Sequence, residues 1–197
     1  MDNNVRASTF TLMMLCGADL GRDKAIREYG MKSKYRLLPK QFGDYNGKKV
    51  FEIERICVGT NTMTFESYMK CRNYNFVLQL LNHVIFRPIY KLTQKIGFSW
   101  FDISKLVANA LTEDSFTGKL KDLYNEFCKE SADECFDSIE ECIEYYSIQE
   151  NYDLLMKGDI GENLIAKYTA KGVFIYQDII RSVFSIMKKK MISQNNY

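Results

Sequence analysis

The sequence contains one histidine, His83, and no two of its six cysteines stand at CxxC spacing. Zinc sites are usually built from cysteine and histidine ligands that lie close together in the sequence. A site of that kind would here have to gather scattered ligands, so we expect no metal site. His83 has no neighbouring cysteine or histidine to assist it, which is more typical of a hydrogen-bonded structural histidine in a helix than of a general base.

Proline is scarce as well, with two residues in 197, and hydrophobic residues make up 46% of the chain against 26% charged residues. This composition excludes collagen-like and low-complexity proteins. Polar and charged residues interrupt the most apolar long stretch, residues 76–96, so we expect no membrane span. The amino terminus lacks the pattern of a secretory signal, and we therefore expect reduced cysteines and a cytoplasmic location.

Charge is divided unevenly along the chain. Residues 1–111 hold 17 Lys/Arg and 9 Asp/Glu, whereas residues 112–197 hold 10 and 16. The two halves could attract each other or different partners. Basic side chains gather near the aromatic residues of a predicted hairpin, as in surfaces that bind phosphates and stack bases. The chain has no signature of a known nucleic-acid-binding module, so nucleic acid is not the expected partner.

Strand-like patterns occupy the first third of the sequence. Residues 8–15 form a short apolar run that ends before Cys16 and Gly17, which predicts a buried strand leading into a loop. Residues 21–30 predict a short helix, with Gly30 at its end. Two further runs within residues 34–60 flank Asn46-Gly47, and this strong turn signal predicts a β-hairpin.

From Thr64 onward, apolar residues recur mostly at helical spacing. With Thr64 as N-cap, the first predicted helix runs until Pro88 kinks or ends it. Further helices are predicted over residues 100–111, 118–129, 132–157, 162–170 and 173–191, with a linker at 112–118. The predicted fold is therefore mainly α with a small β part. Residues 1–63 would hold a strand and the hairpin, and residues 64–197 the helices.

The long helix predicted for residues 132–157 is rich in acidic residues, and cysteines recur every seven residues at Cys128, Cys135 and Cys142. On one straight helix, neighbouring cysteines of this set would lie about 10 Å apart. That separation is too large for one metal ion, so small buried core residues are the better interpretation. The carboxylates of residues 133–144 are typical of a solvated helix face rather than of a catalytic acid/base pair.

Several short motifs, taken in order, resemble cobalamin-dependent radical S-adenosylmethionine proteins. The matching pieces lie within residues 8–85 and read LMMLCGADL, RDKAIREYGMKSKYR, GDY, FEIERICVGT and NTMTFESY, with a weaker echo in GDIGENLIAKYTAK. In that family the stretch runs from a late strand of the barrel into the carboxy-terminal extension. The resemblance therefore implies that residues 1–63 are a remnant of the barrel end, with a barrel-type strand and the hairpin, and that residues 64–197 are a helical carboxy-terminal extension. Cys16 stands where the family has proline, and Asp19 where it has glutamate.

The resemblance implies that this chain has no catalysis of its own. The family uses S-adenosylmethionine, a [4Fe–4S] cluster held by CxxxCxxC and cobalamin held through D-x-H-x-x-G, and neither motif occurs here. We therefore expect the chain to bind none of these cofactors.

The chain would be a carboxy-terminal fragment or split half that braces the barrel and shapes the substrate side, with the missing amino-terminal portion as its partner. Candidate contacts with the substrate or partner are Asp19, Arg36, Thr60, Asn61 and Thr62. The alternative is a freestanding helical interaction module, with its basic amino-terminal half as a candidate surface for nucleic acid.

Overall fold

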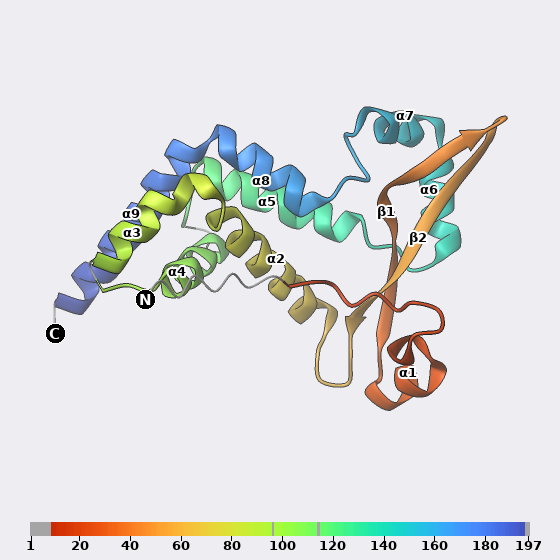
Figure 1. The fold of residues 1–197 in the computed structure, drawn as a ribbon, viewed down its shortest axis with the longest axis horizontal. Helices are drawn as coiled ribbons and strands as arrows, with labels where there is room; N and C mark the ends of the chain where they lie inside the picture. The colour runs from red at the N-terminus through yellow and green to blue at the C-terminus, as the bar shows by residue number, and fades with distance from the viewer. Residues whose placement is uncertain (1–8, 96, 114, 196–197) are drawn as a thin grey trace. The chain divides into compact units, whose positions relative to one another are not determined.

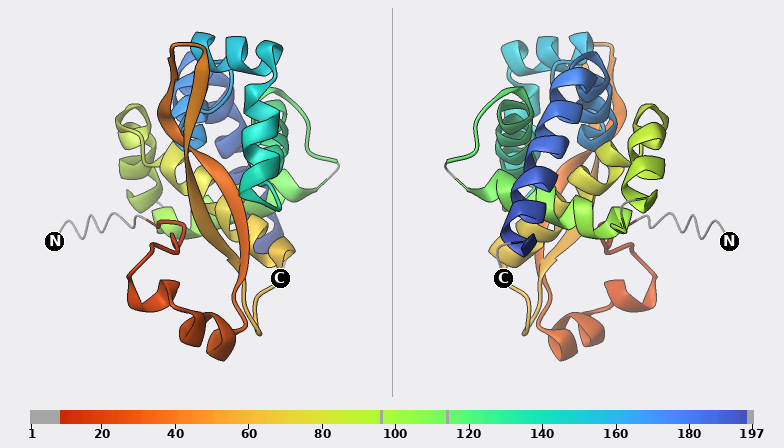
Figure 2. Two further views of the ribbon diagram at one scale, coloured as in Figure 1. Left: turned by 90° about the vertical axis from the view of Figure 1, so that its right-hand side faces the viewer. Right: turned by 90° about the vertical axis from the view of Figure 1, so that its left-hand side faces the viewer.

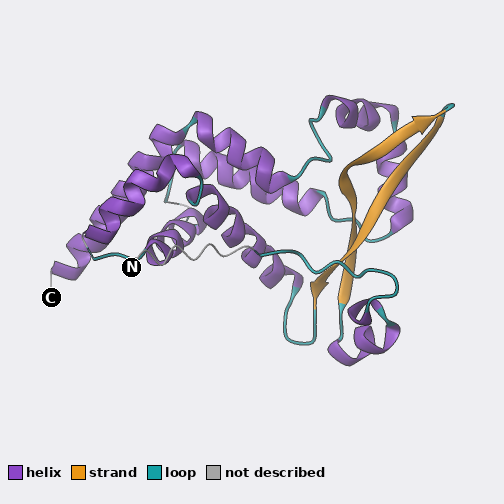
Figure 3. Cartoon of the chain, viewed as in Figure 1, coloured by secondary structure: helices purple, strands orange, loops and turns teal. Residues whose placement is uncertain are grey.

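A computed structural model describes residues 9–95, 97–113 and 115–195. The chain is mostly helical, at 62%, and the described strands form one two-stranded antiparallel sheet (Figures 1 and 3). The prediction of a mainly α protein with a small β part is confirmed. The sheet is not a closed barrel, so the barrel-type description is wrong for the described residues.

The described elements follow in chain order. They are a 3-10 helix at Asp19–Gly21, α1 (Asp23–Tyr29), β1 (Lys32–Tyr45), β2 (Lys48–Gly59), α2 (Phe65–Leu81), a second 3-10 helix at Val84–Phe86, α3 (Arg87–Lys95), α4 (Trp100–Thr112), α5 (Lys119–Asp133), α6 (Ile139–Ser147), α7 (Gln149–Lys157), α8 (Leu164–Phe174) and α9 (Tyr176–Asn195). The predicted short helix before residue 30 is confirmed as α1, and Gly30 ends it in the left-handed conformation with φ 57°.

Contacts group the chain into two compact units. The helical unit comprises Met1–Thr9, Cys71–Lys129 and Leu164–Tyr197, of which only the described residues are discussed, and the hairpin unit comprises Phe10–Lys70 and Glu130–Asn163. Both units are discontinuous in sequence, and the expected boundary between residues 63 and 64 falls inside the hairpin unit.

The predicted β-hairpin is confirmed, and its strands twist around each other (Figure 2). Its turn is Asn46-Gly47, where both residues have positive φ and the N–H of Gly47 donates to Oδ1 of Asp44 at 2.7 Å. A bulge interrupts β1, because Leu37 pairs with Ile53 while Phe42 pairs with Phe51. The extra residues in β1 shift the register of all strand pairs that lie beyond the bulge, on the side away from the turn.

The strand predicted at residues 8–15 is reduced to a single antiparallel bridge between Met13 and Ile56. Two hydrogen bonds hold it beside β2: Met14 N–H donates to Arg55 O at 2.8 Å, and Cys57 N–H donates to Leu12 O at 2.9 Å. Residue 8 lies outside the described residues. Met14 is buried, but the side chains around it are not, so the expectation of a buried strand is wrong.

The helix that begins after Thr64 ends earlier than predicted. Thr64 is its N-cap, because Oγ1 accepts from the N–H of Ser67 at 3.1 Å. Helix α2 stops at Leu81, and Pro88 stands in the first turn of α3, where its missing N–H leaves no intrahelical bond unmade. His83 lies between α2 and the 3-10 helix, where Nδ1 accepts from the N–H of Ile85 at 3.4 Å.

The single helix predicted over residues 132–157 is three separate pieces: the end of α5, then α6 and α7. The first break occurs where Phe136 leaves the helix and exchanges two backbone hydrogen bonds with Tyr35 of β1, at 2.8 and 2.9 Å. Ser138 then caps α6 by accepting from the N–H of Glu141. Sheet pairing therefore overrides the helical pattern, and the cysteines at seven-residue spacing do not share one helix.

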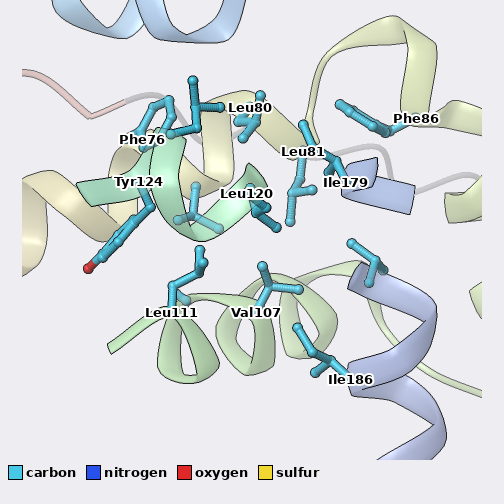
Figure 4. Close-up of a cluster of buried hydrophobic side chains, with 14 of the residues drawn as sticks. Phe76, Leu80, Leu81, Phe86, Val107, Leu111, Leu120, Tyr124, Ile179 and Ile186 are labelled. Carbon is cyan, nitrogen blue, oxygen red and sulfur yellow. The ribbon is translucent and has the colours of Figure 1, made fainter. Parts of the chain in front are cut away.

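The core of the helical unit is a set of aromatic and aliphatic side chains from α2, α4, α5, α8 and α9 (Figure 4). Phe76 and Phe127 stack with ring centroids 4.1 Å apart, and Tyr168 meets both rings edge-on. Gly172 is buried beside this set, and a Cβ there would come within 2.5 Å of Leu80 Cδ1. The close approach of α8 to α2 explains why glycine stands in mid-helix.

The hairpin unit has a smaller aromatic core. Leu37, Phe51 and Ile53 of the hairpin pack against Tyr146 of α6 and Tyr152 of α7. Figure 1 shows α6 and α7 beside the strands that they cover. Among the described residues, no helix is both long and apolar enough to cross a bilayer.

Candidate functional site

The candidate residue Arg36 lies in a cluster of charged side chains between the hairpin and the residues that follow α5. Nε of Arg36 donates to Glu54, its cross-strand partner, and Nη1 donates to Oε1 of Glu134 at 3.1 Å. The three side chains are 16%, 8% and 17% exposed. Burial alone would lower the pKa of Arg36, but the carboxylates of Glu134 and Glu54 outweigh it, so that this pKa lies above its ordinary value.

One guanidinium thus serves two carboxylates, and it joins three segments that are far apart in the sequence. Arg36 remains charged at every pH at which the protein is folded, so it neither takes nor gives a proton. The arrangement holds β1, β2 and the end of α5 in fixed positions. The role of Arg36 is therefore structural, since its donors are already directed at Glu54 and Glu134. We call such a stabilising contact a brace.

The candidates Thr60, Asn61 and Thr62 form a turn against the end of α1. Thr60 Oγ1 accepts from the N–H groups of Thr62 and Met63, at 3.3 and 3.1 Å. Asn61 reaches α1, because its N–H donates to Tyr29 O at 3.0 Å. A Cβ at position 30 would lie 1.9 Å from Asn61 Oδ1, so Gly30 makes room for this contact.

Asp19 lies in the first 3-10 helix, is highly exposed and pairs with Arg22 at 3.2 Å. Across the described part of the chain, no hydrogen bond or ion pair joins Asp19, Arg36 and the Thr60–Thr62 turn to one another. The five candidates therefore take part in three separate sets of contacts. Asp19, Asn61 and Thr62 are exposed, whereas Arg36 and Thr60 are partly buried.

Several of the basic residues of the hairpin, which suggested nucleic-acid binding, have acidic or polar partners within the hairpin unit. Lys34 pairs with Asp137 at 2.6 Å, and Lys40 pairs with Glu162 at 3.3 Å. Lys49 donates to Ser147 O and to Gln149 Oε1, and its ammonium lies 4.6 Å from the ring centre of Tyr152. A phosphate would have to compete with these contacts, which weakens the interpretation of the hairpin as a phosphate-binding surface.

The cysteines at seven-residue spacing are indeed packing residues, although on different elements. Cys142 is fully buried in α6, while Cys128 and Cys135 are half-buried. Burial, helped by the charge of Glu141, raises the pKa of Cys142 to about 12, and burial also raises the pKa of Cys128. Within the described residues, no group of three or more Cys, His, Asp or Glu side chains is arranged to hold a metal ion.

Thiol labelling tests this assignment of the cysteines. At pH 8 a thiol with a pKa of about 12 is ionised to about one part in ten thousand, and the thiolate is the reactive form. With N-ethylmaleimide followed by peptide mass spectrometry, we expect the exposed Cys16 and Cys71 to be modified at least about tenfold faster than Cys142. Equal rates in denaturant are the control. Labelling of Cys142 as fast as Cys71 in the folded protein would contradict the burial.

The most unusual surface of the hairpin unit is the segment around the Met13 bridge. Phe10 is 91% exposed, and Leu12, Met13, Leu15 and Leu20 are also exposed large apolar side chains. The sequence pattern identified an apolar strand here, but not its exposure, because the pattern does not show how little of the chain covers it. Exposed apolar residues gathered in one short segment are typical of an interaction site.

Comparison with known proteins adds no relative: no protein-family model matches this sequence, and no match was found among curated proteins.

Proposed function

We propose that this chain is a non-catalytic carboxy-terminal portion, or separately encoded half, of a cobalamin-dependent radical S-adenosylmethionine enzyme. In this proposal the segment at residues 10–15 pairs with a strand of the portion that carries the chemistry. The order of the motifs in the first 85 residues supports the family. The observation that carries the proposal is the unfinished strand at Met13.

Strand geometry shows why this segment suits a partner strand. Met14 N–H and Leu12 O point toward β2, where they bond to Arg55 and Cys57. Backbone groups alternate in direction along a strand, so the N–H and carbonyl of Met13 point to the opposite edge. Among the described residues, these two groups have no hydrogen-bond partner. An open strand edge with exposed apolar side chains is a template for an added strand.

The remaining candidates fit the role of a brace. The ion cluster of Arg36 with Glu54 and Glu134 stabilises the hairpin that carries the unfinished strand. The turn at Thr60–Thr62 holds α1, and α1 follows that strand directly. The side chain of Asp19 is 90% exposed, and we propose it as the contact with the substrate or with the catalytic portion.

Hydrogen exchange tests the proposal. The amides of residues 10–16 are compared in the isolated chain and after co-expression with the polypeptide encoded immediately upstream. We expect the N–H of Met13 to exchange at least about tenfold more slowly in the complex, because a partner carbonyl would then accept it.

The variant Met13→Pro removes only the outward N–H and should abolish the complex without unfolding the chain. The matched control is Met13→Leu, which should bind normally. The proposal also requires the upstream reading frame to encode CxxxCxxC and D-x-H-x-x-G. If the isolated chain is a monodisperse monomer with strongly protected amides at residues 10–16, the proposal is overturned and a freestanding helical interaction module becomes the better interpretation.

A further inference from the structure

Helix α6 has an apolar side that is only partly buried. Cys142 and Tyr146 are buried against the hairpin, as expected for a helix with one core-facing side. The isoleucines Ile139 and Ile143, one turn apart, and Ile148 just beyond the helix end are 40–51% exposed. Isoleucine is a weaker helix former than the residues that usually occupy exposed positions, so these side chains are not explained by the stability of α6 alone.

Acidic side chains stand beside these isoleucines. Glu140 and Glu144 are exposed and one turn apart, and neither has a hydrogen bond or an ion pair with another described residue. Glu141 differs, because it accepts from the N–H of Asp137 at 2.8 Å. We call the combined surface of Ile139, Glu140, Ile143, Glu144 and Ile148 the α6 face. It is apolar in the middle and negative along one side.

A surface of opposite charge lies on α9. Its core side is formed by Ile179, Val183, Ile186 and Met187. The α9 face is the outward set Phe184, Lys188, Lys189, Met191 and Ile192, in which the apolar members are 38–52% exposed. Phe184, Lys188 and Ile192 follow one another at four-residue spacing and so lie on one stripe. Lys188 and Lys189 are exposed, and within the described residues they have no ion pair.

We propose that the chain associates with itself, with the α9 face of one copy docking on the α6 face of a second copy. Each face offers exposed branched or aromatic side chains to the other, and the two glutamates meet two lysines. The apolar contact would supply affinity, while the charges would select the orientation and the partner. This inference does not depend on the proposed function.

The geometry also sets the strength and form of the association. Each face spans only two to three helical turns. The area that it can bury is therefore smaller than the roughly 800 Å² per partner of a stable interface. We therefore expect reversible association that depends on concentration. Because the two faces differ, each copy can use both of them, and the assembly either closes into a ring of two or more copies or grows as an open chain.

Sedimentation velocity provides the first test, with the full chain measured from about 10 µM to about 1 mM. At about 0.05 M NaCl we expect the weight-average sedimentation coefficient to rise with concentration, and at about 0.5 M NaCl we expect a markedly weaker rise, because exposed ion pairs are screened. A chain that stays monomeric over the whole range at low salt would overturn the proposal.

Charge reversal identifies the faces. The variants E140K/E144K and K188E/K189E should each associate at least about tenfold more weakly than the wild type, because like charges then meet. The control E52K/E150K makes the same change of charge at exposed glutamates outside the α6 face. It should associate as the wild type does. Equal loss in the control would mean that net charge, and not these faces, is responsible.

Mixing the two reversed variants protects the test against misfolding. In an equal mixture, the lysines of one variant's α9 face the glutamates of the other variant's α6, and the remaining interface has both charges exchanged. Association should then return, although each variant alone is monomeric. Failure to regain it while both variants keep their circular dichroism spectra would overturn the proposal. The variant Met13→Pro should associate normally, which separates this contact from the open strand edge.

Discussion

Replacing Arg36 with methionine is expected to lower the free energy of unfolding by about 3–5 kcal/mol. Methionine keeps much of the apolar stem but removes the charge, so that Glu54 and Glu134 remain largely buried without their shared cation. Two neighbouring carboxylates then repel each other in an environment that solvates them poorly. Urea denaturation followed by circular dichroism measures the change.

A control with an exposed ion pair distinguishes the buried cluster from an ordinary surface contact. The matched control is Lys34→Met, which breaks an ion pair whose acidic partner, Asp137, is 80% exposed. That variant should lose at most about 1 kcal/mol. Equal losses in the two variants would show that the Arg36 cluster is no brace.

Replacing Phe127 with alanine should cost about 3–5 kcal/mol in the helical unit. Phe127 has no exposed surface, stacks on Phe76 and meets Tyr168 edge-on with ring centroids 5.6 Å apart. Its loss removes apolar burial and both aromatic contacts, and it leaves a cavity between rigid helices. Chemical denaturation with far-ultraviolet circular dichroism reports the change, because α2, α5 and α8 supply these rings.

The control for this substitution is Phe174→Ala, at the end of α8, where the ring is largely exposed. Its effect should stay within about 0.5 kcal/mol. A loss for Phe127→Ala that is as small as this would mean that the aromatic cluster is loosely packed. A difference of several-fold between the two phenylalanines would support the core as described.

Turn chemistry was the most reliable part of the sequence pattern. Asn46-Gly47 located the hairpin, because its positive φ angles are tolerated by few other residue pairs. The register below the turn was not predictable. Close to the turn Tyr45 pairs with Lys48, but the bulge before Phe42 brings Arg36 opposite Glu54. A regular hairpin with the same turn would place Cys57 there, and the ion cluster would not form.

The predicted helix boundaries were wrong where tertiary contacts determine the ends of the helices. The acidic, cysteine-spaced pattern of residues 132–157 is compatible with one helix, but the pairing of Phe136 with Tyr35 makes the first break and Ile148 interrupts the helix again between α6 and α7. Pro88 was interpreted as the end of a helix, although the same residue suits the first turn of the next one. A local pattern cannot choose between such alternatives, because the competing interactions come from distant residues.

The candidate site was only partly predictable, again because contacts with distant residues decide it. Arg36 was found through the resemblance, but its partner Glu134 lies 98 residues away in the chain. The turn at Thr60–Thr62 was identified as a feature, but its contact with α1 was not, because Gly30 indicated only the end of a short helix. The strand edge at Met13 is exposed because no described strand pairs with it on that side. A pattern of apolar residues in the sequence does not show this.

The bridge between Tyr35 and Phe136 also affects the order in which the chain folds during synthesis. At a synthesis rate of about 5–20 residues per second, roughly 5 to 20 seconds separate the emergence of these two residues from the ribosome. A β-hairpin forms within microseconds, so β1 and β2 would pair long before α6 and α7 exist to cover Leu37 and Phe51. During that interval the nascent hairpin exposes an apolar face and an open edge. We therefore expect the chain to require a chaperone at the ribosome more than its modest size would suggest.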